Sequence, residues 1–276
     1  MSVSKIKNLI LLILALAIIG LLPAVVPTQA ARVGSEKKVH EKLEALYESY
    51  GLSLDASSLP ASQTLYSIEL ENPDATKPAA QALLGGKAAE EEAPARMLAQ
   101  YSAGSSTLQL SRSGQLEGRF TDASAAHDLT RATRRYLRSM DFDIAEIFEP
   151  VRLSAGVYSV TAVQSLCGAP VFESALTFTY RNSALSRVDG TYYPAGEIVR
   201  VSQRACISCA DALVALLSSR DSLGWVGSEI VSCEQGYVHS ETASSALRFV
   251  PVWRIETDAG TFYVNGITRE VRQLAS

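Results

Sequence analysis

Apolar and polar residues alternate along much of the chain, and the clearest example lies near the C-terminus. Residues 248–271 form two alternating runs that meet at residues 258–260, Asp-Ala-Gly. A period of two is typical of β-strands, and Gly260 can adopt the positive φ that a three-residue hairpin loop needs. We therefore predict a β-hairpin in which Trp253 and Ile255 share one face and pack beneath a preceding helix.

The same reasoning assigns elements to most of the chain. Apolar residues at helical spacing predict helices over residues 40–50 and 124–140 and from Ser208 onward, where Ser208 and Asp211 have the form of a capping box. Alternation predicts a hairpin and further strands at residues 63–71, 107–120, 156–164, 170–180, 185–192, 229–233 and 236–239.

The order of these elements indicates the fold class and a domain division. A helix followed by strands occurs over residues 124–192 and again over 208–271, and a degraded copy begins at His40. We predict an α+β fold in which an N-terminal transmembrane helix precedes repeated helix-plus-antiparallel-sheet units. The expected parts are 1–31 (cytoplasmic start and anchor or signal peptide), 32–122 (first α+β unit) and 123–276 (tandem units, about 123–200 and 201–276).

Residues 72–96 differ in character from the segments around them. They are rich in alanine, proline, glycine and glutamate. This composition predicts a mobile loop with a short helix around residues 79–84.

The N-terminus allows two interpretations. Lys5 and Lys7 precede an apolar run that extends from Asn8 to Val26. Its length nearly suffices for a membrane-spanning helix, whereas small residues ending at Ala30 also suit cleavage of a signal peptide. In either case the lysines place the N-terminus in the cytoplasm and the main domain outside the membrane.

Composition excludes one class of partner. The chain has 276 residues, of which 47% are hydrophobic, and a formal net charge of −4. Nucleic-acid binding requires a concentrated basic surface, so we expect no nucleic-acid partner. Four arginines on the predicted helix 124–140 are interpreted as a solvated face, with a docking face as the alternative.

The four cysteines are Cys167, Cys206, Cys209 and Cys233. An even number in an exported chain is typical of disulfides, so all four are candidates for disulfide or buried-thiol roles. Cys206 and Cys209 form a C-x-x-C at a helix start, which leaves thiol-redox chemistry open. A zinc site usually shows two close cysteine pairs, and here the other two cysteines stand apart.

The sequence offers no convincing catalytic motif. His40, His127 and His239 lie in separate predicted elements, and neither a nucleophile elbow nor a phosphate-binding glycine loop occurs. We expect a protein that is not an enzyme, with no catalytic residue, cofactor or metal.

Three segments together resemble a known family. The stretch 251–271, which begins Pro-Val-Trp, the stretch 167–174 and the spaced residues of 182–190 (Asn182, Leu185, Val188 and Gly190) are similar to segments of YycI-type proteins of Gram-positive bacteria. Related sheet modules of the PepSY type share these motifs. The family commonly has a glycine in a Thr-Gly-Glu-Val turn, where this chain has Arg269.

The resemblance implies a membrane-anchored, non-catalytic regulator of the sensor histidine kinase WalK (YycG), which governs cell-wall metabolism. The implied partners are the membrane helices and extracellular domain of that kinase and a related YycH-like regulator. It also favours a retained single-pass anchor in the cell membrane, with Leu12, Leu16 and Ile19 as candidates for its helix interface. The alternative is a secreted PepSY-like binding or inhibitory module for a protease or a cell-wall enzyme.

Overall fold

The computed structural model describes residues 29–71, 76–86, 88–92, 97–111, 113–121, 123–240 and 247–274. In the helix that begins at Gln29, side chains are described from Lys38 onward. The predicted membrane segment, including Leu12, Leu16 and Ile19, lies outside the described residues.

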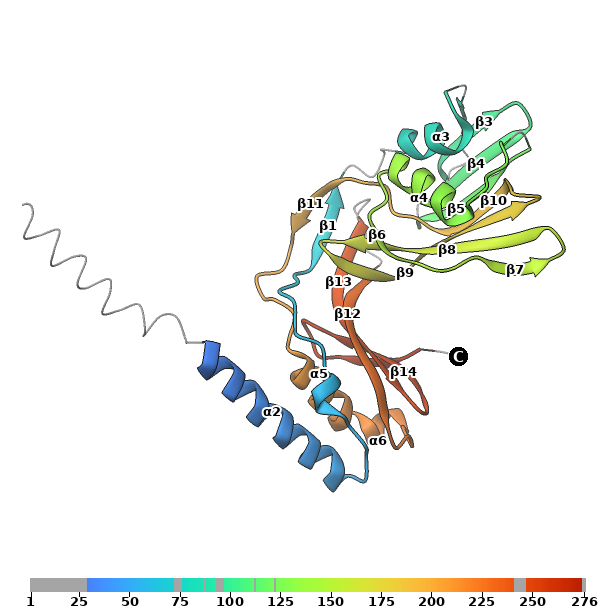
Figure 1. Ribbon diagram of the computed structural model, residues 1–276. Coiled ribbons are helices and arrows are strands. Elements are labelled where there is room, and N and C mark those ends of the chain that lie inside the picture. The colour runs from blue at the N-terminus through green and yellow to red at the C-terminus, as the bar shows by residue number, and fades with distance from the viewer. Residues whose placement is uncertain are drawn as a thin grey trace, which may run out of the picture.

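The described strands form two twisted lobes that share one hydrogen-bonded network (Figure 1). Neighbouring strands of the first lobe are β2 (Ala89–Glu91), β3 (Met97–Ala103), β4 (Ser106–Ser111), β5 (Gln115–Arg119), β10 (Ala184–Thr191), β9 (Ala169–Arg181) and β8 (Val157–Leu166). Two short strands, β6 (Ile144–Ile147) and β7 (Val151–Ser154), follow one another along the outer edge of β8.

The second lobe is built around two long antiparallel strands. Its strands are β12 (Ile230–Ser240), β13 (Leu247–Thr257), β14 (Gly260–Asn265), β15 (Val271–Gln273), β1 (Ile68–Glu71) and β11 (Glu197–Arg200). One edge of β13 pairs with β12, and the other pairs first with β1 and then with β14. A parallel contact between Tyr237 of β12 and Val171 of β9 connects the lobes.

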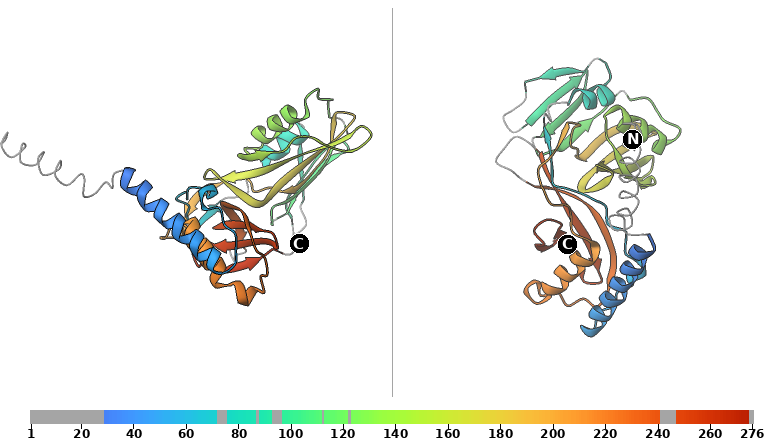
Figure 2. Two further views of the ribbon diagram at one scale, coloured as in Figure 1. Left: turned by 60° about the horizontal axis from the view of Figure 1, so that its bottom comes forward. Right: turned by 90° about the vertical axis from the view of Figure 1, so that its left-hand side faces the viewer.

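Helices cover each lobe separately (Figures 1 and 2). The first lobe packs against α3 (Lys77–Leu84) and α4 (Leu129–Ser139), and the second against α2 (Gln29–Ser49), α5 (Cys209–Ser218) and α6 (Arg220–Leu223). Each lobe therefore buries its own apolar core, as expected of helices laid on sheets. The predicted α+β class is confirmed.

The start of α5 follows directly from its sequence. The Ser208 hydroxyl accepts a hydrogen bond from the backbone N–H of Asp211 at 3.1 Å, which satisfies one of the free donors of the first turn. Leu213 and Leu216 are fully buried against the sheet. The predicted cap and buried face are confirmed, except that the Asp211 carboxylate accepts from the Ser208 hydroxyl instead of reaching the backbone.

The predicted start of α4 at residue 124 is wrong. The helix begins at Leu129, because the Asp128 carboxylate accepts from the backbone N–H of Arg131 at 2.8 Å and caps it there. Ala125 instead forms an isolated bridge to Ala184, the first residue of β10. The helix's arginines are exposed on its outer side, as predicted: Arg131, Arg134, Arg135 and Arg138.

The short helix predicted around residues 79–84 is confirmed as α3, whereas the strand β2 in the same segment was not predicted. Ala79, Ala80 and Leu83 of α3 are buried in the first core, so small side chains here serve close packing. Sequence patterns also missed β3, β6, β7 and β11, and they divided the continuous strand β12 into two. The predicted strand 63–71 is paired only from Ile68 onward.

The C-terminal hairpin is confirmed in outline. Trp253 and Ile255 are fully buried in the core that contains α5. The connection has two residues, since Thr257 pairs directly with Gly260, where we predicted three. Gly260 has the expected positive φ, 133°.

Chain order and spatial order differ in this fold. The helix α2 and strand β1 belong to the second lobe, whereas β2–β5 complete the sheet of the first. The predicted division at residue 122 therefore separates strands that the structure places in one sheet.

Candidate functional site

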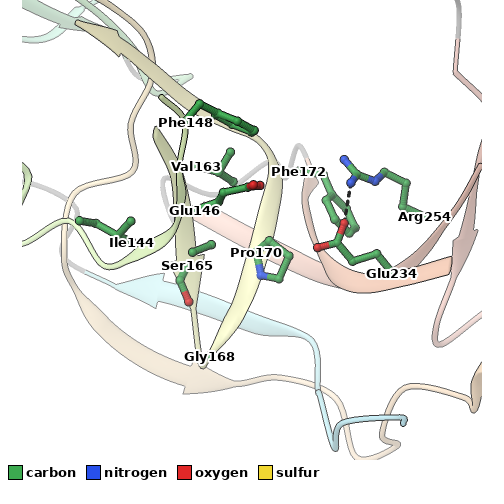
Figure 3. A pocket seen from close by; sticks show the side chains of 11 residues that line it. Ile144, Glu146, Phe148, Val163, Ser165, Gly168, Pro170, Phe172, Glu234 and Arg254 are labelled. Atoms are coloured by element: carbon green, nitrogen blue, oxygen red, sulfur yellow. Dashed lines mark hydrogen bonds and ion pairs between the residues drawn. The ribbon is translucent and has the colours of Figure 1, made fainter. Parts of the chain in front are cut away.

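A groove of about 610 Å³ opens where the two lobes meet (Figure 3). Phe148 and Glu146 come from the edge of the first lobe, Pro170 and Phe172 from the start of β9, and Arg254 from β13. The floor is contributed by β8. Residues far apart in sequence thus line one open depression.

The wall from the second lobe carries a charged pair over an aromatic ring. Arg254 donates a hydrogen bond to the Glu234 carboxylate at 2.5 Å, and its guanidinium carbon lies 4.5 Å from the centre of the Phe172 ring. Phe172 in turn stacks on Tyr263, with ring centres 5.6 Å apart. These contacts hold Arg254 in place, because its planar group is fixed by both the carboxylate and the ring.

The opposite wall continues into an exposed apolar edge, which we call the edge ribbon (residues 144–154, comprising β6 and β7). Phe148 is 44% exposed, Val151 58% and Leu153 59%. In the described residues β6 and β7 pair only with β8, so their outer edge has no strand partner. Such an edge presents unpaired backbone donors and acceptors and is a template for strand addition.

Comparison with models of protein families identifies the family of this chain. The model described as "YycI protein" matches residues 59–267, about three quarters of the chain. The chain belongs to the YycI family. Proteins of this family are non-catalytic regulators of the YycG (WalK) sensor-kinase system.

Two solved structures are weakly similar to this chain. An uncharacterized protein from Eubacterium rectale ATCC 33656 is 8% identical, with a TM-score of 0.49, and the match covers 77% of this chain and 86% of that one. The YpeB C-terminal domain of Bacillus megaterium is 12% identical, with a TM-score of 0.37 and coverage of 75% and 99%. A comparison with curated proteins found no match.

The YycI motif residues occupy positions with strict backbone requirements. Gly190 has φ of 136°, and a Cβ there would lie 2.0 Å from the carbonyl oxygen of Ala175. Only glycine fits this close approach between β10 and β9. Arg269, which replaces the expected glycine, has φ of 67°, in the left-handed region that glycine normally occupies.

Three of the cysteines border the core of the second lobe. Cys209, the first residue of α5, is buried, whereas Cys206 and Cys233 are partly buried. Cys233 lies on β12, on the face opposite Glu234 and the groove. Cys167 is exposed in the turn between β8 and β9, and all four cysteines are free thiols.

The cysteines of the C-x-x-C motif do not have the environment of a reactive thiolate. Burial raises the pKa of the Cys206 thiol. The hydrogen bond with Cys233, together with burial, raises the pKa of Cys209. Reactive cysteines instead have a lowered pKa in electropositive surroundings, so this geometry gives no support to thiol-redox catalysis.

The other polar residues considered from sequence stay dispersed. His239 packs against the rings of Tyr193 and Phe249, with ring centres 5.4 and 5.8 Å away. His40 lies in α2 and His127 precedes α4. Within the described ranges no group of three or more His, Cys, Asp or Glu side chains could hold a metal ion.

The predicted anchor interface cannot be placed in the site, since Leu12, Leu16 and Ile19 fall outside the described residues. Among the helices that are described, none is long and apolar enough to cross a bilayer. Sequence reasoning missed the edge ribbon and the groove. The local signal was the alternation of Val151 and Leu153, but this run has only four residues because it begins directly after Pro150.

Proposed function

We propose that this protein is a non-catalytic extracytoplasmic regulator of a sensor histidine kinase that governs cell-wall metabolism. It acts by protein–protein contacts, through an N-terminal membrane helix and through the outer domain. The observation that carries this proposal is the YycI match over residues 59–267. A regulator of this kind needs to bias the kinase by only about 1–3 kcal/mol to change its activity several-fold.

For the outer domain, the proposed contact surface is the edge ribbon with the adjoining groove. An extended segment of the sensor kinase or of a YycH-like regulator would add a strand beside β7 and cover Val151 and Leu153. Phe148 and Arg254 in the groove would contact its side chains. Burying the exposed parts of the two aliphatic residues would contribute about 1 kcal/mol each.

For the membrane part, the proposed anchor is the apolar run 8–26, with Lys5 and Lys7 on the cytoplasmic side. The helix α2 begins at Gln29, close behind this run, and its N-terminal end projects from the rest of the protein in Figure 1. At its other end Leu43 and Tyr47 are buried in the second core. Because α2 is fixed at this end, it would transmit the position of the anchor to the outer domain.

The edge ribbon is tested by the double variant Val151→Asp and Leu153→Asp. The matched control is Val226→Asp, which places a carboxylate at a valine that is 87% exposed and distant in sequence from the ribbon. Binding to the purified extracytoplasmic domains of the cognate kinase and of a YycH-like regulator is measured by titration. We expect the double variant to weaken binding to one of them about 10- to 100-fold and the control to leave it unchanged. Equal binding by the wild type, the double variant and the control would contradict the proposed surface.

The anchor is tested separately. Photo-crosslinking residues at Leu12, Leu16 and Ile19 are expected to capture a kinase membrane helix, whereas the same residues at Leu14 and Ile18, on another side of a helix, are expected to capture less. Isolation of only a mature form that begins at Ala31 would exclude the anchor and favour the secreted alternative.

A further inference from the structure

One face of α4 carries four arginines in a row. Arg131, Arg134, Arg135 and Arg138 are spaced i, i+3, i+4 and i+7, so they share one side of the helix over roughly 10 Å. All four are exposed, and within the described residues none of their guanidinium groups forms an ion pair or a hydrogen bond. We call these four residues the arginine stripe.

The arginine stripe lacks the carboxylates that accompany other arginines of this protein. In the described ranges the following arginines each pair with a carboxylate: Arg119, Arg187, Arg248, Arg254, Arg269 and Arg272. The helix α4 contains no acidic residue, and Asp128 at its start is engaged in the cap. Arg131 and Arg135 place like charges one turn apart, as do Arg134 and Arg138, and such pairs destabilise a helix. This arrangement indicates a negatively charged partner outside the chain.

The arginine stripe has a fixed direction, because the opposite side of α4 is attached to the sheet. Thr133 and Leu137 are fully buried there, and the hydroxyls of Thr133 and Tyr180 of β9 lie 2.8 Å apart in a hydrogen bond. At the end of the helix, the Tyr192 hydroxyl donates to the carbonyl of Met140 at 2.8 Å. Both contacts hold α4 so that the stripe points away from the sheet.

The outer side of α4 faces the same way as the N-terminal end of α2. In the left view of Figure 2, α2 (blue) rises to the upper left toward its N-terminal end, and α4 (green) lies on the upper left side of the first lobe. The right view, seen from the left-hand side of Figure 1, shows both helices on the near side. The proposed anchor, residues 8–26, ends just before α2 in the sequence, so this side of the protein would face the membrane.

We propose that the arginine stripe docks on the anionic phospholipid headgroups of the membrane that holds the anchor; this inference rests on the anchor proposed above. Guanidinium groups bind phosphate through paired hydrogen bonds, and clusters of about four to eight basic side chains near a membrane are attracted to anionic lipids. No residue of α4 lines the groove, and a convex helix face suits an extended charged surface better than a small ligand. Docking would hold the first lobe against the membrane, while α2 connects the second lobe to the anchor.

The experiment uses the full chain reconstituted in nanodiscs, either of phosphatidylcholine alone or with about one third phosphatidylglycerol. Exposed arginines are modified with a dicarbonyl reagent, and the modification of each one is quantified by mass spectrometry. We expect the stripe arginines to react about 5- to 10-fold more slowly in the anionic discs, and this protection to disappear in about 1 M salt, which screens the attraction. Arg181 is the internal control, because it is exposed and has no ion pair among the described residues; its rate should be the same in both discs.

The anchor and the stripe can fail separately in this experiment. Retention of the chain by the neutral discs tests the anchor, and a chain that neither disc retains contradicts the anchor and this inference with it. A retained chain whose stripe reacts equally fast in both discs would overturn the inference alone. So would protection by added poly(glycerol phosphate) or polyglutamate without protection by the anionic discs, since the stripe would then serve a soluble polymer or an acidic protein.

A double variant links the protection to the stripe itself. Arg131→Gln with Arg135→Gln removes half of the charge and keeps residues that favour a helix. We expect the protection of Arg134 and Arg138 in anionic discs to fall below about 2-fold, and the midpoint of urea unfolding not to decrease, because a repulsion has been removed. Arg181→Gln should leave the protection as in the wild type. Undiminished protection in the double variant would show that the lipid charge does not act through the stripe.

Discussion

The indole Nε1 of Trp253 donates a hydrogen bond of 2.9 Å to the backbone carbonyl of Ile207. Trp253 is fully buried on β13, and Ile207 directly precedes the Ser208 cap of α5. The bond thus connects the C-terminal hairpin to the start of the helix above it. A single residue provides both packing area and a polar connection between these elements.

Replacing Trp253 by phenylalanine should remove this bond and leave a small cavity. We expect the free energy of unfolding to fall by about 2–4 kcal/mol, because the partly buried Ile207 carbonyl loses its partner and the smaller ring fills less of the buried space around residue 253. The matched control is Trp225→Phe. The Trp225 Nε1 has no hydrogen-bond partner among the described residues, so this variant should lose less stability. Urea unfolding followed by circular dichroism compares the two, and equal losses would contradict a role for the bond.

Gly190 should tolerate no side chain. An alanine there would combine a φ of 136° with a Cβ 2.0 Å from the Ala175 oxygen, so β10 and β9 would have to separate. We expect Gly190→Ala to reduce the free energy of unfolding by at least about 2 kcal/mol. Gly86→Ala is the control, since its φ is ordinary and a Cβ there meets no atom within 4 Å. A loss at Gly190 no greater than the control's would show that the strands can adjust.

The sequence predicted those elements whose pattern and end signals agree. Ser208 supplies a cap and the leucines after it a buried face, so α5 was found; the alternation around Trp253 likewise revealed the hairpin. The prediction failed where a local pattern is short or compositionally ambiguous. The exposed three-residue strand β2 lies in a segment whose composition resembles a loop, and β7 has four exposed residues with nothing to mark its inner face.

The groove could not be predicted for a different reason. Phe148 and Arg254 lie on strands of different lobes, and only the pairing of β12 with β9 brings them to one depression.

The hairpin of β13 and β14 should become less stable in acid because of Asp258. Its carboxylate accepts from the Ser228 hydroxyl at 2.7 Å and from the Ser228 backbone N–H at 2.9 Å, and these bonds hold the pKa of Asp258 below its ordinary value. A lowered pKa means that the charged form contributes stability above the unfolded-state pKa, and that this contribution is lost as the pH falls through the folded-state value. We expect wild type to exceed Asp258→Asn in stability above about pH 5 and the difference to vanish well below pH 4.

The titration of this group can be measured directly by NMR. Ser228→Ala removes the hydroxyl but keeps the backbone donor, so the pKa of Asp258 should move part of the way back toward its ordinary value. An unchanged pKa in that variant would show that the backbone N–H alone sets it.

Arg269 should be replaceable by the glycine that is common in the family. Its φ of 67° is unfavourable for a residue with a Cβ, and its ion pair with Asp211 is long, at 3.8 Å. We expect Arg269→Gly to raise the free energy of unfolding by about 0.5–1 kcal/mol, the relief of strain exceeding the added entropy of the unfolded chain. Arg269→Ala removes the same ion pair but keeps the Cβ, so it should bring no gain. If both variants behave alike under urea, the conformation of residue 269 stores no strain.

Arg254 should matter for partner binding more than for stability. It is held between the Glu234 carboxylate and the Phe172 ring in the wall of the groove, where a partner segment lying along the edge ribbon would meet it. Arg272 offers a matched control outside the groove lining, because it pairs with Glu173 at 3.0 Å and lies over the Tyr263 ring at 5.1 Å.

Exposed or partly exposed ion pairs contribute little to folding, so we expect either substitution by glutamine to change the free energy of unfolding by less than about 1 kcal/mol. The two variants should differ in binding, which is measured by titration against the extracytoplasmic domains of the kinase and the YycH-like regulator. Arg254→Gln should weaken binding about 5- to 30-fold, and Arg272→Gln should not. Equal affinities for the two variants would place the contact elsewhere on the outer domain, even if the edge ribbon itself proved necessary.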